Sequence, residues 1–348
     1  MAKFKAGNKT ILNRKDCFVI SEAGVNHNGS LRLAKKLVDA AIYSGADAVK
    51  FQTFKAENVV TETARLAEYQ KKNLGKNTTQ LEMIKKLELD YGAFRDLKNY
   101  CDKKRIIFLS TPHTFDAVDF LEPLVPAYKV GSGDLNNLPF LRKIAKKKKL
   151  VILSTGMAKL SEVAVAVEAI KKAGNNKIIL LHCTTNYPCP LVEVNLSAMS
   201  SLKEKFNLPV GYSDHTAGII VPVMAVTLGA KVLEKHLTLD RSLSGPDHKA
   251  SMEPDEFREM VKAVRDAEKV LGSGKKIPTE SEKKIRYIVR KSIVACCDIP
   301  KDTKITGRML SIKRPGTGIS PGHMDSIIGK TVTRRIRKGS LIKPEDLR

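Results

Sequence analysis

The sequence contains no tryptophan, and aromatic residues make up only 5% of its 348 residues. Proteins that bind single-stranded nucleic acids stack bases on aromatic side chains interleaved with basic ones, and that pattern is missing here. No apolar run approaches the ~20 residues of a transmembrane helix. The first ten residues, MAKFKAGNKT, lack the apolar core of a signal peptide. We therefore expect neither a membrane-spanning nor a secreted protein.

Cysteine is also sparse, with six residues and no CxxC pair. Cys296 and Cys297 are adjacent, which is poor geometry for a bond between them. Six thiols in a chain of this length do not form a disulfide scaffold. We therefore expect reduced cysteines and a cytoplasmic location.

Positive charge, in contrast, is in excess: 61 Lys and Arg residues against 37 Asp and Glu residues give a net charge of +24 at pH 7. This balance suits phosphates, sugar acids or nucleic acids as ligands. The lysines are scattered, however, and the one local run is Lys146 to Lys149. A lysine-rich solvated surface is therefore the preferred interpretation, with no nucleic-acid partner. A protein that binds nucleic acid or an acidic polymer stays open as an alternative from another functional class.

Short β-type runs alternate with amphipathic helical patterns from Phe18 onwards. Eight expected strands begin at Phe18, Ala48, Ile106, Ala127, Leu150, Ile178, Leu208 and Lys231. Helical patterns cover residues 31–45 and 161–174, the second with Ser161 as the expected N-cap and Gly174 at its end. Eight strands alternating with helices over ~250 residues predict an α/β fold, a (β/α)8 TIM barrel. A doubly wound sheet fits less well, because the turn after the first strand, AGVNHNG, is not GxGxxG.

The composition changes after Gly272. We assign residues 1–275 to a catalytic barrel domain, 276–284 to a polar linker and 285–348 to a small, mostly β domain. The last 64 residues carry 15 basic and 5 acidic side chains, and Pro-Gly turns interrupt their short apolar runs. We therefore expect this domain to have little core of its own and to lean on another surface.

The strand ends are where chemistry is expected, because active sites of barrels lie at the C-terminal ends of their strands. Successive side chains of a strand face opposite sides. Val49 and Phe51 suit the helix layer, so Lys50 and Gln52 should face the barrel mouth. The same alternation turns inward a second set of polar side chains, namely Glu22, Lys129, Glu234 and His236. Buried lysines are costly unless they meet an anion.

Small hydroxyl and glycine corners follow several of these strands. They are Ser110-Thr111, Gly131-Ser132-Gly133, Ser154-Thr155-Gly156 and Ser213. Any one such corner is ordinary at a strand end. Four corners together with two inward lysines predict a phosphate site.

A metal site is suggested by His215 and His236, which follow neighbouring strands and can reach one point. Two imidazoles with additional oxygen ligands suit a divalent ion that keeps open positions for a substrate. A lone histidine is more often structural, and His182 and His27 are weaker candidates.

The motifs that contain these residues resemble the sialic acid synthase family. They are, in order, SEAGVNHNGS, KFQTF, FLSTPH, KVGSGDLNNLP, ILSTGM, LHCTTNYPCP, GYSDHTAG, LEKHLTLDR, GPDHKAS and KRPGTGISP, spread from about residue 17 to the C-terminal region. The resemblance implies condensation of phosphoenolpyruvate with an N-acetylated hexose, typically N-acetylmannosamine, to give a sialic acid and phosphate. It also implies a barrel followed by an antifreeze-like (SAF) domain in a domain-swapped homodimer.

The resemblance assigns roles residue by residue. The implied metal ligands are His215 and His236, with Mn²⁺, or alternatively Mg²⁺ or Co²⁺, as the ion. The implied phosphoenolpyruvate site is Lys50, Lys129, Ser132, Ser154 and Ser213, and the implied acceptor site is Glu22, Gln52, Tyr187, Glu234 and Asp247. Of these, Glu22, Lys50, Lys129 and Glu234 are the expected catalytic residues. Arg314 resembles an arginine that reaches into the partner's active site to hold the N-acetyl group.

Three features depart from the commonest family pattern: Thr185 and Asn186 before Tyr187, Asp134, and KFQTF. They resemble the branch that includes legionaminic acid synthases. We expect an N-acetylneuraminate synthase, with N,N'-diacetyllegionaminate synthase as the alternative. An aldolase with Lys129 as Schiff-base lysine and a 3-deoxy sugar-phosphate synthase are the rival enzymes.

Overall fold

The computed structural model describes residues 4–6, 9–12, 16–66, 70–71 and 79–348. The chain divides into two compact units, Met1–Gly272 and Ser273–Arg348. Within the described residues, no helix combines the length and the apolar character that a membrane span requires. All six cysteines lie in the described ranges and are free thiols.

The first unit is built on eight parallel strands. They are β3 (Phe18–Gly24), β4 (Ala48–Thr53), β5 (Ile107–Pro112), β6 (Ala127–Val130), β7 (Leu150–Ser154), β8 (Ile178–His182), β9 (Val210–Asp214) and β10 (Val232–His236). Their order in the sheet is β5-β4-β3-β10-β9-β8-β7-β6, and β5 and β6, at the two ends of this order, also lie against each other. The sheet therefore closes on itself, and the predicted TIM barrel is confirmed.

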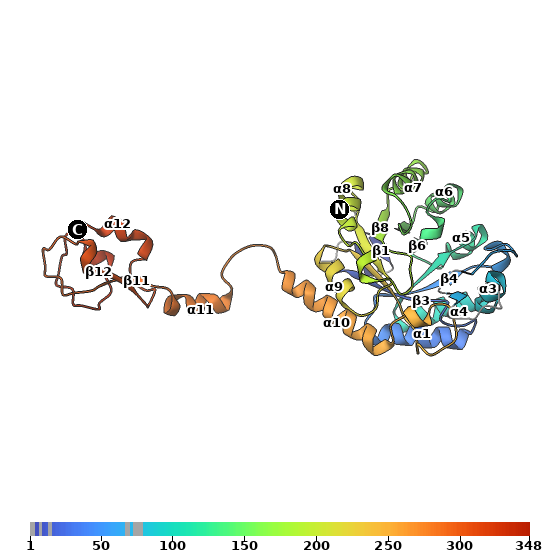
Figure 1. Cartoon of the computed structure of the whole chain (residues 1–348), viewed down its shortest axis with the longest axis horizontal. Helices are drawn as coiled ribbons and strands as arrows, with labels where there is room; N and C mark the ends of the chain where they lie inside the picture. The colour runs from blue at the N-terminus through green and yellow to red at the C-terminus, as the bar shows by residue number, and fades with distance from the viewer. Residues whose placement is uncertain (1–3, 7–8, 13–15, 67–69, 72–78) are drawn as a thin grey trace. The chain divides into compact units, whose positions relative to one another are not determined.

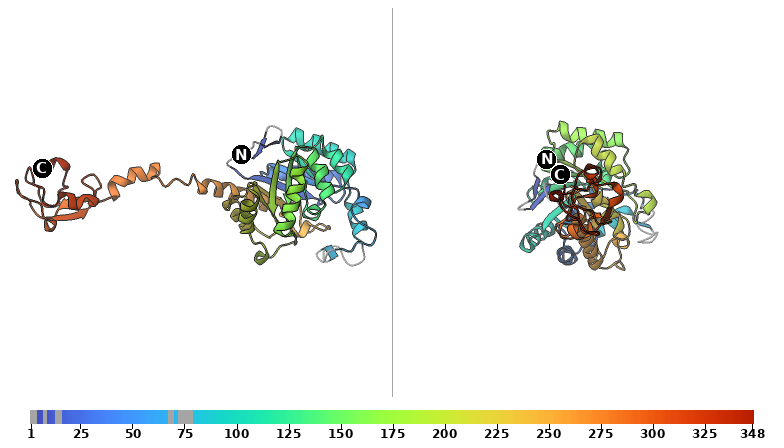
Figure 2. Two further views of the ribbon diagram at one scale, coloured as in Figure 1. Left: turned by 90° about the horizontal axis from the view of Figure 1, so that it is seen from above. Right: turned by 90° about the vertical axis from the view of Figure 1, so that its left-hand side faces the viewer.

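Helices surround this barrel (Figure 1), and Figure 2 shows the same layering from two further sides. They are α1 (Leu31–Tyr43), α3 (Gln80–Leu87), α4 (Tyr91–Lys104), α5 (Phe115–Leu121), α6 (Leu138–Lys146), α7 (Leu160–Lys172), α8 (Ala198–Phe206), α9 (Ile220–Thr227) and α10 (Pro254–Leu271). A short antiparallel hairpin of β1 (Phe4–Ala6) and β2 (Lys9–Leu12) precedes them.

The start of α7 corrects one expectation. We expected Ser161 to be the N-cap, but the helix begins at Leu160 and its N-cap is Lys159. The Glu162 carboxylate accepts a hydrogen bond from the Lys159 amide at 2.8 Å, which satisfies a backbone donor that would otherwise have no partner. The expected end is right, because Gly174 follows the helix with a φ of 82°.

Two apolar layers confirm the predicted alternation of inward and outward side chains along the strands. One cluster fills the barrel and includes Phe18, Ile20 and Ala48. The other lies between the strands and the helices and includes Val49 and Phe51. Because side chains alternate along a strand, the polar residues in register with the inner cluster point into the barrel.

The second unit contains a two-stranded antiparallel sheet of β11 (Ser292–Ala295) and β12 (Leu310–Lys313), with helices α11 (Glu280–Val289) and α12 (Met324–Ile327). Further isolated β-bridges join its loops, in agreement with the expected β character.

Two details of this unit differ from the sequence-based expectation. The unit has a buried core of its own, which is made of Ile293, Ala295, Ile299, Ile305, Ile327, Val332, Ile336 and Ile342. Most of this core consists of isoleucines that are apart in the sequence and that turns bring together. The short apolar runs of the sequence therefore do not indicate it. In addition, α11 begins inside the expected linker, since Thr279 and Glu282 form a capping box at its start.

Candidate active site

Four charged side chains meet inside the barrel at the C-terminal ends of β3, β4, β6 and β10. Lys50 Nζ lies 2.7 Å from Glu22 Oε2 and 3.7 Å from Glu234 Oε2. Lys129 Nζ lies 3.2 Å from Glu234 Oε1. All four side chains are buried. Positive and negative groups alternate, so each buried charge has an opposite charge beside it, which offsets its loss of hydration. We call these four residues the charged tetrad.

Polar neighbours hold the charged tetrad in place. Gln52 Nε2 donates to Glu22 Oε1 at 3.1 Å, and Lys50 Nζ donates to Thr111 Oγ1 at 3.0 Å. Ser213 Oγ donates to Glu234 Oε1 at 3.0 Å. These contacts come from β4, β5 and β9, so most of the barrel circumference contributes to one site.

The two carboxylates of the charged tetrad differ in acidity. Burial opposes the charge of Glu234, but Lys129 and Lys50 outweigh burial and hold the pKa of this carboxyl below its ordinary value. Burial is the main cause of a raised pKa for Glu22; Lys50 opposes this rise and Glu234 adds to it. Two nearby carboxyls whose pKa values move apart are typical of active sites.

Hydroxyl groups lie at the ends of β6 and β7. Ser132, in the turn η2 (Ser132–Asp134), accepts a hydrogen bond from the Gly156 amide at 3.0 Å, and its Oγ lies 3.2 Å from Cys183 Sγ. The Ser154 hydroxyl is buried and has no hydrogen-bond partner among the residues that the structure describes. A Cβ at Gly156 would lie 2.4 Å from Thr185 Oγ1, so glycine is needed for this close approach. A buried hydroxyl of this kind can donate a hydrogen bond to an anionic ligand.

The two predicted histidines come together beside Tyr187. The ring centroids of His215 and His236 are 5.6 Å apart, and the Tyr187 ring lies 4.1 Å from that of His215 and 5.6 Å from that of His236. His215 Nδ1 lies 2.7 Å from the Thr184 carbonyl oxygen, which fixes this nitrogen as the protonated one and leaves Nε2 with its lone pair.

Several observations fit these two rings to a metal ion. Burial lowers the pKa of both histidines, so both imidazoles are neutral near pH 7, which is the form that binds metals. His236 Nδ1 is buried, and no described residue forms a hydrogen bond with it. Over the part of the chain that the structure describes, no group of three His, Cys, Asp or Glu side chains forms a ligand set. The rings therefore suit an ion whose other ligands are substrate or water oxygens.

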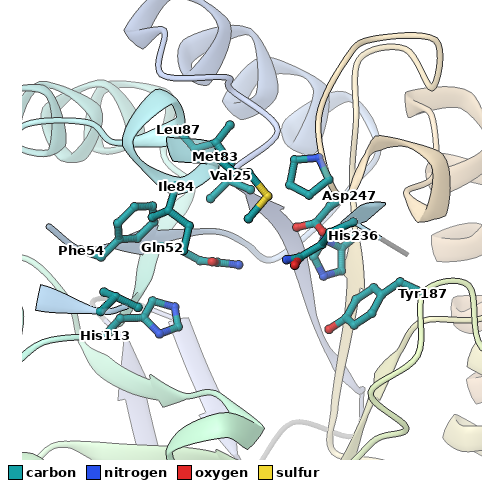
Figure 3. A pocket seen from close by; sticks show the side chains of 13 residues that line it. Val25, Gln52, Phe54, Met83, Ile84, Leu87, His113, Tyr187, His236 and Asp247 are labelled. Atoms are coloured by element: carbon teal, nitrogen blue, oxygen red, sulfur yellow. The ribbon is translucent and has the colours of Figure 1, made fainter. Parts of the chain in front are cut away.

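A cavity of about 240 Å³ lies beside His236 and Tyr187 (Figure 3). Its walls differ in character. The polar side chains are Gln52, Gln70, His113, Tyr187, His236 and Asp247, and the apolar ones are Val25, Phe54, Val59, Met83, Ile84, Leu87 and Pro246. Most of the apolar side chains belong to a separate hydrophobic cluster around α3, which we call the α3 wall. The cavity can therefore contact polar and apolar parts of one ligand.

Asp247 precedes the short helix η4 (His248–Ala250) and lines this cavity beside His236. Burial, with a smaller contribution from the Glu22 charge, raises the pKa of its carboxyl to about 7. Asp247 therefore holds a proton over a pH range in which a solvated aspartate has lost it.

This pKa predicts a pH-dependent stability. Between about pH 4 and 7 the folded, metal-free protein binds one more proton at Asp247 than the unfolded chain does, so its free energy of unfolding falls as the pH rises. The slope contributed is at most about 1.4 kcal/mol per pH unit, and it vanishes above pH 7. We expect Asp247→Asn to remove this slope in urea unfolding at pH 5, 6, 7 and 8. Parallel curves for wild type and variant would contradict the prediction.

Arg314, His182 and His27 have different neighbours from the site residues described above. Arg314 belongs to the second unit, directly after β12, and is exposed. His182 Nε2 lies 2.8 Å from the Val194 carbonyl oxygen, and His27 Nδ1 accepts a hydrogen bond from the Gly29 amide. The ring of His182 lies 5.7 Å from that of Tyr212, and the ring of His27 lies 6.1 Å from that of Phe51. Tyr212 and Phe51 belong to the apolar layer between strands and helices, so both histidines have structural surroundings.

The site predicted from the sequence did not include two parts of the cavity lining, His113 and the α3 wall. His113 was present in the motif FLSTPH and follows β5 directly, so its position at a strand end was a usable signal. The α3 wall had no comparable signal, because its apolar residues follow an ordinary helical pattern.

The comparison with known proteins agrees with this geometry. A model of the NeuB family matches residues 37–276. The chain belongs to the NeuB family. The predicted membership of the sialic acid synthase family is thereby confirmed, and a model of the SAF domain matches residues 290–348 of this NeuB protein.

Two relatives and one solved structure illustrate the family. The N,N'-diacetyllegionaminic acid synthase of Legionella pneumophila is 49% identical over 331 residues, 94% of this chain and 93% of the relative. The enzyme of the same name from Campylobacter jejuni is 49% identical over 332 residues, 94% of this chain and 99% of the relative. The structure of N-acetylneuraminic acid (sialic acid) synthetase from Leptospira borgpetersenii has a TM-score of 0.72 and 36% identity, covering 81% of this NeuB protein and 94% of that chain.

Proposed function

We propose that this NeuB-family enzyme condenses phosphoenolpyruvate with the open-chain aldehyde of an N-acetylated hexose. The products are a nine-carbon sialic-acid-type sugar and inorganic phosphate. The observation that carries the proposal is the pair of inward lysines, Lys50 and Lys129, below a cavity lined by His236. Such a site offers positive charge for a phosphorylated carboxylic acid next to room for an uncharged sugar.

For the acceptor we propose a 2,4-diacetamido-6-deoxy hexose, the substrate type of an N,N'-diacetyllegionaminate synthase. This replaces N-acetylmannosamine, which we expected first. Two synthases named for this product are 49% identical to the chain, whereas the N-acetylneuraminic acid synthetase is 36% identical. The α3 wall supports the same choice, because a 6-deoxy sugar ends in a methyl group where N-acetylmannosamine ends in a hydroxymethyl group. An apolar surface favours the methyl group.

The chemistry assigns separate tasks to the residues. The enol C3 of phosphoenolpyruvate forms a bond to the aldehyde carbon, and the aldehyde oxygen takes up a proton. Water adds at C2, and the resulting tetrahedral intermediate releases phosphate by C–O cleavage. Lys50 and Lys129 hold the anionic groups, and the unpaired Ser154 hydroxyl donates to one of their oxygens. Asp247, whose pKa is about 7, is placed to exchange a proton with the acceptor.

A divalent ion bound by His215 and His236 would polarise the aldehyde oxygen as a Lewis acid, with Mn²⁺ first and Mg²⁺ or Co²⁺ as alternatives. The chain's own contribution is to keep both imidazoles neutral and to direct His215 through the Thr184 carbonyl. Tyr187 closes one side of the two rings and limits the access of bulk water.

We further propose a domain-swapped homodimer in which Arg314 of each chain holds the acceptor's N-acetyl group in the other chain's barrel. The second unit has its own apolar core, so it can fold as a unit and be exchanged. The exposed guanidinium of Arg314 is available for such a contact.

The decisive experiment is phosphate release from phosphoenolpyruvate with a panel of sugars. We expect the highest kcat/KM with the 2,4-diacetamido-6-deoxy hexose and a lower value with N-acetylmannosamine. No release with any aldehyde sugar would overturn the proposal. Borohydride trapping with pyruvate tests the rival aldolase, since only a Schiff-base enzyme would be labelled at Lys129.

Lys50 and Lys129 differ in the number of their partners, and this difference leads to a prediction. Lys50 contacts two glutamates and a threonine, whereas the one partner of Lys129 within the described residues is Glu234. Lys129 therefore keeps more ammonium hydrogens for a ligand. We expect Lys129→Met to lower kcat/KM for phosphoenolpyruvate by a factor of about 10 to 150, the loss of one charge-assisted hydrogen bond.

The matched control is Lys172→Met, which removes a lysine from a surface ion pair with Glu168. It should leave the kinetics unchanged, because exposed pairs contribute little and this one lies on α7. Equal kinetics for wild type and Lys129→Met would show that the phosphoenolpyruvate site lies elsewhere.

A further inference from the structure

A second buried ion pair lies directly behind the two histidines, on the opposite face of the strands. Lys235 Nζ pairs with Asp214 Oδ2, and both residues are only 1% exposed. The two residues are register partners in the pairing of β9 with β10. They face the layer between strands and helices, whose other members are apolar side chains such as Tyr212 and Leu233.

The pair also contacts the chain on the far side of His215. Lys235 Nζ donates to the Thr216 carbonyl oxygen at 2.6 Å. Asp214 Oδ1 accepts hydrogen bonds from the Thr216 amide at 3.0 Å and the Thr216 hydroxyl at 2.9 Å. The residues before and after His215 are therefore both held by this pair, and Lys235 itself precedes His236.

Net stability is a poor explanation for such a pair. Replacing a buried ion pair by apolar residues of similar volume is often neutral or stabilising, because two charges lose their hydration. A pair in an otherwise apolar layer is better explained by the geometry that it imposes. That geometry is a fixed register between two strand ends, each of which carries one histidine.

We infer that the Asp214–Lys235 pair positions the two histidines so that their free nitrogens can share one divalent ion. Asp214 and Lys235 are positioning residues: they contact neither the cavity nor the charged tetrad in any described interaction. The inference rests on the proposed function, because the metal site belongs to it. Residues that orient metal ligands in this way affect metal affinity although they never contact the ion.

The test is the double variant Asp214→Leu/Lys235→Met in the full-length chain, with Mn²⁺ alone as the probe. Removing both charges leaves no unpaired buried ion, so the variant should fold and keep a Tm close to that of wild type. We expect its Kd for Mn²⁺, measured by electron paramagnetic resonance titration, to rise about 10- to 100-fold.

The control is Asp47→Leu/Arg265→Met, which replaces a partly buried ion pair, 2.9 Å between Arg265 Nη2 and Asp47 Oδ2, at the other end of the strands. It should leave the Mn²⁺ affinity unchanged whatever it does to stability. If the double variant does not fold, Asp214→Asn/Lys235→Met takes its place, since it also removes both charges and keeps an oxygen acceptor for the Thr216 amide. Wild-type Mn²⁺ affinity in either folded variant overturns the inference.

If the proposed metal site itself is wrong, the Mn²⁺ titration gives a different result. In that case wild-type protein binds no Mn²⁺, or His215→Ala binds it as tightly as wild type does. If wild type binds Mn²⁺ and His215→Ala does not, the metal site stands. The variants of the ion pair then decide the positioning role by themselves.

Discussion

Chelation of divalent metal ions abolishes phosphate release from phosphoenolpyruvate, and added Mn²⁺ restores it: this is the largest effect that we expect. The reason is that an aldehyde oxygen without a Lewis acid must carry the developing charge alone, and metal stabilisation is worth several kcal/mol. Two neutral imidazoles, one with a buried nitrogen that has no partner among the described residues, fit the ion. We expect His236→Ala to lower kcat by at least about a thousandfold, or ~4 kcal/mol.

The matched control is His182→Gln. His182 also ends a barrel strand, but its ring lies against Tyr212 in the apolar layer between strands and helices. It should retain wild-type metal affinity and respond to the chelator and to Mn²⁺ as wild type does. Full activity of thoroughly demetallated wild type, with metal content checked by elemental analysis, would contradict the prediction.

Mixed dimers regain activity: this is the second large effect. Arg314→Ala and His236→Ala chains should each be nearly inactive alone, because one lacks the acceptor contact and the other a metal ligand. If Arg314 acts on the partner's barrel, a heterodimer contains one intact site, which combines His236 of one chain with Arg314 of the other. Random pairing makes half of the dimers heterodimers, so co-refolded mixtures should reach about a quarter of wild-type activity.

Action of Arg314 within its own chain gives no recovery, because every site then contains one of the two substitutions. Native mass spectrometry must therefore show that heterodimers are present. Heterodimers without activity would rule out the swapped arrangement. A mixture of Lys313→Ala and His236→Ala chains is the control: Lys313 precedes Arg314, so Lys313→Ala chains should be active alone and the mixture should show only their activity.

The predicted inward positions agree with the structure where they depend on one strand at a time. Lys50, Lys129 and Glu234 face into the barrel because alternate side chains of a strand face the same side, and that rule needs no tertiary information. The contacts among these side chains depend on the tertiary structure. That Lys50 lies between two carboxylates follows from β3, β4 and β10 being neighbours in the closed sheet.

The sequence by itself determined the eight strands, their inward residues and the family, because periodicity and ordered motifs are properties of local chain segments. Only the tertiary structure decided three further features: the α3 wall of the cavity, the core of the second unit, and the ion pair behind the histidines. Each of them joins residues that are apart in the chain, and their contacts depend on how strands and helices pack. Alternation predicts that Lys235 faces away from the barrel interior, but only the pairing of β9 with β10 gives it Asp214 as a partner.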